Sequence, residues 1–226
     1  INNGGGGIAH AAIQAGVGNS TTGLYDLTIS GGGTTCEIYG DTTIHRNMEA
    51  GGSTTVLRGA LTVTGNLSVV STLNTQFSST DRDLTVTGKT EIATGGTLTC
   101  NDSTCLFNST GTAGGIVFTG NGGTFTAGAS SNITYGSIWL YNGASVDFTA
   151  SGTNTVNSYF GADIVRFTAN SVEGNMGPLT ITTTGTNNKK LFFGDANVFN
   201  VILTPTSATT YILGDDGHSE IGGSLT

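Results

Sequence analysis

The sequence has few charged residues, few prolines and no basic cluster. Charged side chains make up 10% of the 226 residues, and there are only 2 prolines. Disorder normally accompanies high charge or abundant proline, so this composition argues against a disordered chain. The 7 basic residues are scattered and the net charge is −8. Because binding to a nucleic acid needs Lys and Arg on one face, we expect no nucleic-acid partner.

Long apolar runs and metal-binding motifs are also missing. No apolar run approaches the roughly 20 residues of a transmembrane helix, so we expect no membrane span. No CxxC motif and no pair of histidines has the spacing of a zinc site, so we predict neither a metal nor a cofactor. The chain begins at Ile1 and shows no signal peptide, which indicates a processed product or part of a longer protein.

Cysteine is scarce, and the three residues Cys36, Cys100 and Cys105 cannot all pair within one chain. In an oxidising compartment Cys100 and Cys105 could close a small disulfide loop. The alternative, which we favour, is three small buried residues in strands, because a free cysteine behaves as a small hydrophobic side chain.

Glycine is abundant, with 37 residues, and the apolar residues alternate with threonine. In the stretch Leu61–Val69, apolar residues alternate with small hydroxylated ones on either side of Gly65-Asn66. Alternation with a period of two predicts half-buried strands, and Gly-Asn is typical of turns. A weak helical pattern appears only in residues 8–15.

The strand pattern recurs at intervals close to 20 residues. The intervals are 23 residues for Leu61 to Leu84 and Phe125 to Phe148, 19 for Phe148 to Phe167, and 21 for Ile181 to Ile202. Such a period suits one coil of a parallel β-helix, or β-solenoid, with three short strands and three Gly/Asn turns. A series of hairpins is the alternative, because Asn121-Gly122 and Asn142-Gly143 are also hairpin signals.

We therefore predict an all-β fold, a parallel β-solenoid, in three parts. Residues 1–23 form a Gly/Ala-rich lead-in or assembly segment, and residues 24–186 form the solenoid repeats. Residues 187–226 are denser in apolar residues and form either the last coils or a β-rich cap. Period two also predicts which side chains point inward, with the threonines between them outward: Leu61, Val63, Leu84, Val86, Phe125, Phe148 and Phe167.

The repeated phrases resemble those of known repeat proteins. Tyr25–Gly33 and Leu61–Val69 look like repeats of phage virion proteins, in fibres and capsid decorations, and of bacterial surface adhesins. The resemblance implies a virion or extracellular location and a structural or adhesive role. It also implies partners: other virion or surface proteins, host-surface glycans, and further copies of the chain, in a trimer if it is a fibre.

A polysaccharide-degrading enzyme on a β-helix is a further alternative, because fold alone does not set function. It would need two carboxylates across a cleft, and Asp81-Arg82-Asp83 is one candidate, joined by Asp147, Asp163 or Asp195 if the coils place them on one face. We expect solvated turn residues instead, and hence no enzyme.

Three other groups of residues have a functional and a structural interpretation. Gly214–Glu220 holds three carboxylates and a histidine that could bind Ca²⁺, but a solvated turn is the preferred interpretation. Trp139 and Tyr141 could stack on sugars, although a core or interface position is favoured. His10, His45 and His218 lie too far apart in sequence to indicate a catalytic triad. We therefore predict no catalytic, cofactor or metal residues.

Overall fold

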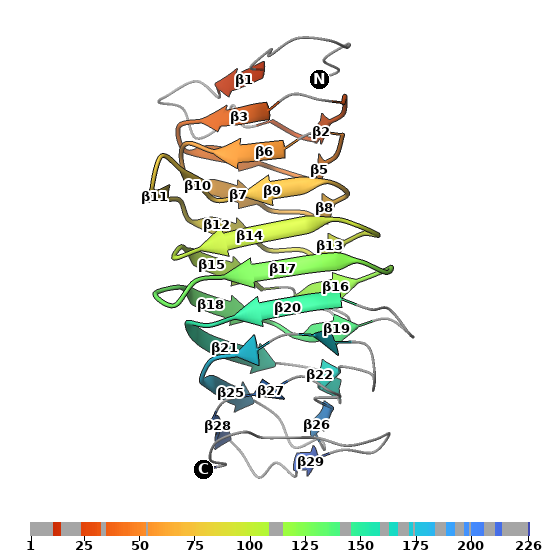
Figure 1. Ribbon diagram of the computed structural model, residues 1–226, viewed down its shortest axis with the longest axis vertical. Coiled ribbons are helices and arrows are strands. Elements are labelled where there is room, and N and C mark those ends of the chain that lie inside the picture. The colour runs from red at the N-terminus through yellow and green to blue at the C-terminus, as the bar shows by residue number, and fades with distance from the viewer. Residues whose placement is uncertain are drawn as a thin grey trace.

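The computed structural model is a rod of stacked coils made of strands, and it has no helix among the residues it describes (Figure 1). These residues are 11–14, 24–32, 35–52, 54–108, 115–140, 146–158, 163–166, 172–173, 175–183, 189–192, 197–198, 200–205, 211–213 and 226. In each coil the chain passes through one strand of each of three parallel sheets and then begins the next coil. The predicted β-solenoid is therefore confirmed.

The three sheets run the length of the rod and are here numbered I to III. Sheet I contains β1 (Ala11–Gln14), β3 (Thr35–Tyr39), β6 (Thr54–Leu57), β9 (Thr72–Asn74), β14 (Thr97–Asn101), β17 (Gly123–Ala127), β20 (Val146–Ala150), β23 (Val172–Glu173), β24 (Asn175–Met176) and β27 (Asn197–Val198). Sheet II contains β4 (Thr42–Ile44), β7 (Leu61–Val63), β12 (Leu84–Val86), β15 (Thr104–Phe107), β18 (Asn132–Tyr135), β21 (Thr153–Ser158), β25 (Leu179–Thr183) and β28 (Val201–Pro205). Sheet III contains β2 (Leu27–Ile29), β5 (Met48–Ala50), β8 (Leu67–Val69), β13 (Thr90–Ile92), β16 (Ile116–Phe118), β19 (Ile138–Leu140), β22 (Asp163–Arg166), β26 (Lys189–Phe192) and β29 (Tyr211–Leu213).

The register between coils confirms two of the spacings seen in the sequence. Leu61 pairs with Leu84 in sheet II, and Phe125 pairs with Phe148 in sheet I. Ile181, however, pairs with Leu203 rather than with Ile202. The sequence spacing of 21 was therefore wrong by one residue, and because side chains alternate along a strand, Ile202 lies on the outer face, 41% exposed.

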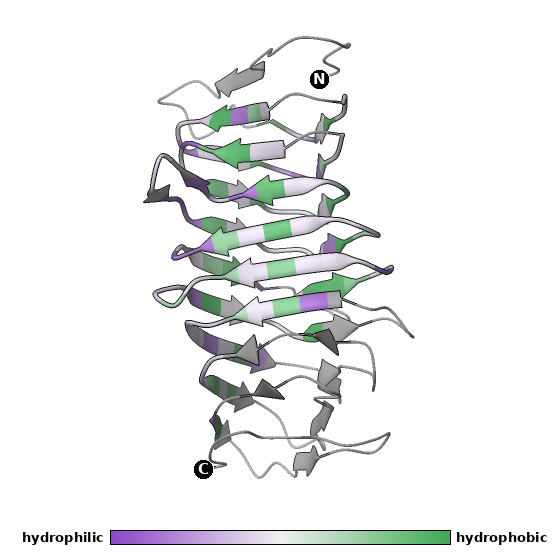
Figure 2. Ribbon diagram, in the orientation of Figure 1, coloured by the Kyte–Doolittle hydropathy of each residue, from purple (hydrophilic) through white to green (hydrophobic). Residues whose placement is uncertain are grey.

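The apolar residues of the strands point inward and form one core along the rod. Leu61, Val63, Leu84 and Val86 are buried, and so are Phe125 and Phe148, as predicted. The threonines between them are half-buried on the outer faces, and Figure 2 shows the alternation along sheet I. Phe167 lies outside the described residues; the strands that follow β20 in sheet I are β23 and β24.

Aromatic rings fill the wide middle of the core. The Phe125 and Phe148 rings are stacked with their centroids 4.9 Å apart, and the Tyr135 ring packs against both. Phe107 stacks on Tyr135 at 6.1 Å. Residues paired in register thus place equivalent side chains on top of one another, and each ring buries the next.

Side-chain ladders hold the corners between sheets II and III. The backbone N–H of Asn66 donates to Asn47 Oδ1 at 3.0 Å, and the N–H of Lys89 donates to Asn66 Oδ1 at 2.9 Å. The neighbouring glycines are required because successive backbones approach closely there. A Cβ on Gly88 would collide with the Gly65 carbonyl oxygen. The Gly-Asn pair of the sequence is thus a corner between parallel sheets and not a hairpin turn.

Among the residues that the structure describes, one hairpin interrupts a coil between β9 and β12. Strands β10 (Gln76–Phe77) and β11 (Thr80–Asp81) are antiparallel and protrude at one edge of the rod (Figure 1). Its two turn residues, Ser78 and Ser79, have φ of 48° and 61°, which is uncommon for residues other than glycine. The sequence analysis did not predict this hairpin.

Residues at both ends of the described chain are hydrogen-bonded to these sheets. Ala11–Gln14 is strand β1, paired in parallel with β3, so the weak helical pattern of residues 8–15 was misleading. At the other end the backbone N–H of Thr226 donates to the Val201 carbonyl at 3.0 Å. The boundaries at residues 23 and 186 remain predictions.

Replacing the stacked Phe148 by alanine should lower the free energy of unfolding by about 3–5 kcal/mol, because it leaves a cavity in the aromatic core. Thr149→Ala, on the outer face of the same strand, should change it by no more than about 0.5 kcal/mol. Urea titrations of both variants measure the difference, and equal losses would contradict the inward and outward assignment.

Gly88→Ala should destabilise the rod, because the new Cβ would force the corner carbonyl of Gly65 to move. Gly32→Ala is the matched control, since nothing lies within 4 Å of the Cβ it would add. Thermal unfolding followed by circular dichroism compares the two. A Tm for Gly88→Ala as high as that for Gly32→Ala would mean that the corners are not closely packed.

Candidate functional site

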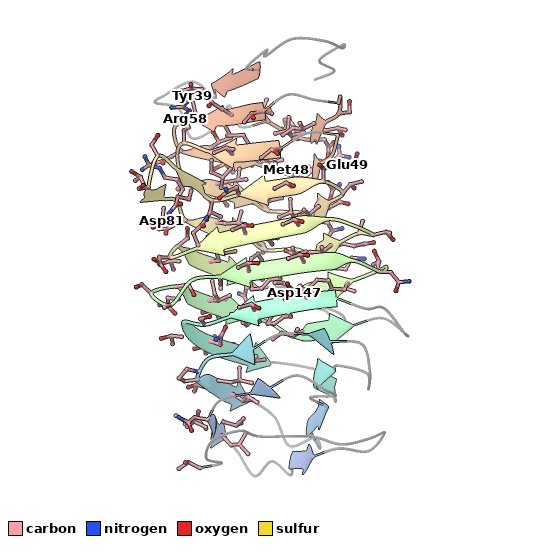
Figure 3. The ribbon with its side chains drawn as sticks, viewed as in Figure 1. Tyr39, Met48, Glu49, Arg58, Asp81 and Asp147 are labelled. Atoms are coloured by element: carbon pink, nitrogen blue, oxygen red, sulfur yellow. The ribbon has the colours of Figure 1, made fainter. Side chains whose placement is uncertain are left out.

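The carboxylates considered for catalysis are spread over different parts of the rod. Asp81 lies on the protruding hairpin and Asp147 on the outer face of sheet I, well separated in Figure 3. Asp163 belongs to β22 of sheet III, and Asp195 lies outside the described residues. The coils therefore do not place Asp81, Asp147 and Asp163 on one face.

Several of these carboxylates accept hydrogen bonds that shape the local backbone. Asp81 Oδ1 accepts from Gln76 Nε2 at 3.0 Å across the hairpin. Asp83 Oδ1 accepts from the backbone N–H of Thr104 in the next coil at 3.3 Å. Asp41 makes the same kind of corner contact, accepting from the N–H of Ala60 at 2.9 Å. Asp83 thus belongs to a repeated corner motif between sheets I and II, which is a structural role.

The structure describes only some of the histidines and aromatic residues considered as site residues. His45 lies at an exposed corner, with its ring 5.9 Å from the Tyr25 ring. Trp139 is in β19, paired with Val117. His10, Tyr141, His218 and the whole cluster Gly214–Glu220 lie outside the described residues.

A buried charged cluster near the first coils was missed by the sequence analysis. Glu37 lies on the outer side of β3, yet its side chain is only 4% exposed. Its carboxylate accepts from Arg58 Nη2 at 2.7 Å and from the Tyr39 hydroxyl at 2.6 Å. The Arg58 guanidinium also lies 4.7 Å from the centroid of the Tyr39 ring. The hydrogen bond to Glu37 raises the pKa of Tyr39, because it favours the protonated hydroxyl.

The spacing of this cluster contains a signal that could have been used. Glu37 and Arg58 are 21 residues apart, two more than the separation of the paired residues Glu37 and Val56, so Arg58 lies just after the neighbouring strand β6. A Glu and an Arg separated by one coil can meet on the same outer face. The cluster is best understood as an ion pair between Glu37 and Arg58 that fastens neighbouring coils together. Figure 3 labels Tyr39 and Arg58 close to each other near one end of the rod.

A second polar group lies inside the rod. Asn154 occupies an inward position of β21 and is fully buried. Its side-chain amide donates to the carbonyls of Ala150 and Gly152 at 2.8 and 2.9 Å, and its Oδ1 accepts from the Tyr135 hydroxyl at 3.0 Å. Every polar atom of this buried amide thus has a partner, which is what a low-dielectric core requires.

The outer face of sheet I carries a repeating pattern of side chains. Two parallel columns of mainly hydroxylated side chains run along it. On each strand, a single inward-pointing residue separates the two columns. The first column is Thr54, Thr72, Thr97, Thr124 and Asp147, and the second is Val56, Asn74, Thr99, Thr126 and Thr149. Neighbouring strands in a sheet lie about 4.8 Å apart, so the hydroxyls repeat along the axis at that interval.

The part of the chain that the structure describes holds no group of three or more His, Cys, Asp or Glu able to bind a metal. Within the same residues there is no helix of sufficient length and apolarity to cross a membrane.

Arg58→Met should lower the free energy of unfolding by about 2–4 kcal/mol, because it removes the guanidinium that pairs with the buried Glu37 carboxylate. The double variant Glu37→Leu/Arg58→Met should recover most of that loss, since both charges are then removed. Lys89→Met is the control, because Lys89 pairs with Glu91 at 2.7 Å in a more exposed position. A double variant no more stable than Arg58→Met would contradict the pairing.

Comparisons of this chain with protein-family models, with curated proteins and with solved structures give no match.

Proposed function

We propose that this chain is a structural and adhesive module of a virion, in a phage fibre or a capsid decoration. The observation that carries the proposal is the stacking of three parallel sheets along one axis. A rod of this kind supplies length and stiffness and presents a repeated surface, which are the properties that attachment structures need. An adhesin at a bacterial surface would use the same properties and is the alternative.

Stiffness follows from how each coil is held. Interior strands are bonded to equivalent strands on both sides, as β14 is to β9 and β17. Corner side chains such as Asn47 and Asn66 add bonds between coils where the strands end. Bending the rod would stretch both sets of contacts together, so the module should transmit force along its axis.

Assembly with other copies or other proteins is favoured by the sheet ends. The last strand of an open sheet presents unpaired backbone groups, which proteins usually cover. We propose that a homo-oligomer, a trimer in the case of a fibre, or a neighbouring virion protein covers these edges.

The hydroxyl columns of sheet I are our candidate for attachment. Threonine hydroxyls both donate and accept hydrogen bonds, as the hydroxyls of sugars do. A periodic row of them, such as Thr72, Thr97 and Thr124, would contact successive residues of an extended host-surface glycan. Many weak contacts along one axis then add up, because binding at one site raises the effective concentration at the next.

A degradative function has less support. Asp81 and Asp83 are hydrogen-bonded within the hairpin and the corner, as described above. Glycoside hydrolysis would need two carboxylates about 5–10 Å apart across a bound sugar.

Incubating the full chain with capsular or cell-wall polysaccharide of the host should release no oligosaccharide, because no acid–base pair is expected. The chain should nevertheless be retained on host cells or on capsids, measured by pelleting. Product release that Asp81→Asn or Asp83→Asn abolishes would overturn the structural interpretation.

Immunogold labelling separates the two locations. Antibodies raised against the chain should label virions in electron micrographs. Labelling of the bacterial envelope instead would favour the adhesin.

A further inference from the structure

Two buried cysteines lie on either side of one corner of the rod. Cys100 is in β14 of sheet I and Cys105 is in β15 of sheet II, and the chain between them makes the corner. Their exposed fractions are 0% and 1%. The corner is tight, because the backbone N–H of Ser103 donates to the Cys100 carbonyl at 3.0 Å and Asn101 has φ of 45°.

Both thiols are buried in the rod, one on either side of this corner. The pKa of the Cys100 thiol is raised well above its usual value. Burial is the main cause, and a hydrogen bond with Cys105 is the second. Both side chains belong to the same core as Phe107, Phe125 and Tyr135. Two thiols in one core, on consecutive strands that flank a tight corner, are candidates for a disulfide, which needs Cα atoms within about 7 Å of one another.

The third cysteine cannot take part. Cys36 lies in β3, and the order β3-β6-β9-β14 places it three strand spacings from Cys100, about 14 Å along the axis. A disulfide needs Cα atoms within about 7 Å of one another. The choice of partners is therefore set by the register of sheet I.

We propose that Cys100 and Cys105 form a disulfide that staples the corner between sheets I and II, and that it forms while the chain folds. The oxidant is a small-molecule disulfide such as glutathione disulfide. One cysteine thiolate attacks it, forming a mixed disulfide and releasing one glutathione thiolate. The second cysteine thiolate then attacks the mixed disulfide and releases the other. The two cysteines lose two protons and two electrons, and the oxidant becomes two glutathione molecules.

The timing follows from the chemistry of the folded corner. Only the thiolate attacks a disulfide, and burial with a raised pKa keeps Cys100 protonated at neutral pH. A small oxidant also cannot reach a side chain with no exposed surface. In the folded rod oxidation must wait for the corner to open locally, whereas in the unfolded chain both thiols are accessible. The presence of the disulfide would thus indicate whether the chain folded in an oxidising compartment. Its formation does not depend on the proposed function.

The test uses the full chain carrying Cys36→Ser, so that one pair of thiols remains. One sample refolds from urea in a buffer of glutathione and glutathione disulfide. A second sample is refolded in the presence of reductant. The reductant is then removed by buffer exchange, and the folded chain is placed in the same glutathione buffer. Free thiols are alkylated in denaturant at timed intervals, and peptide mass mapping identifies the products.

We expect most molecules of the refolding sample to carry the Cys100–Cys105 bond, and the prefolded sample to acquire it at least about tenfold more slowly. Two free thiols or glutathione adducts in the refolding sample would overturn the staple. Equal rates in the two samples would overturn its formation during folding.

A stability measurement tests whether the disulfide fits the corner without distorting it. The oxidised chain should unfold at a higher urea concentration than the same chain under reductant. Cys105→Ser in the Cys36→Ser background is the control, because its midpoint should not respond to oxidant. An oxidised chain with a lower midpoint than the reduced one would show that the corner does not accommodate the bond, and would overturn the proposal.

Discussion

Parallel hydrogen bonding between equivalent strands of successive coils is the constraint on which this structure depends. A strand such as β14 pairs with β9 on one side and β17 on the other, so each coil must present the same pattern of inward and outward residues as its neighbours. The stacked rings of Phe125 and Phe148 and the ladder from Asn47 to Lys89 are consequences of that register. A coil by itself would bury none of them, which is why such folds are stable only as arrays.

The same constraint explains where polar and charged residues are tolerated. Outward positions accept threonine along sheet I, and they accept Glu37 where Arg58 from the following coil neutralises it. The inward polar residue Asn154 finds its partners at a corner, in the carbonyls of Ala150 and Gly152. Chemistry on this scaffold therefore depends on what neighbouring coils present, more than on what is adjacent in sequence.

The fold class and much of the core were predictable from the sequence, because a period of two along a strand decides which face is buried. Leu61, Leu84, Phe125 and Phe148 were placed on that basis. The β10–β11 hairpin was not predicted, since Ser78-Ser79 lacks the usual glycine or asparagine signal. The pairing of Ile181 with Leu203 and the meeting of Glu37 with Arg58 depend on the exact length of a coil, which spacing alone does not fix. The candidate carboxylates could not be separated from structural ones, because corner contacts such as that of Asp83 join residues in different coils.

The β10–β11 hairpin shows that a coil can lengthen without any change in the sheets around it. Leu61 still pairs with Leu84 across that insertion, just as Thr42 pairs with Leu61 where no hairpin intervenes. Each coil advances the rod by one strand spacing, about 4.8 Å, whatever number of residues it contains. The length of the rod is therefore set by the number of coils. Mutation can remodel a corner loop while leaving the distance between the two ends unchanged.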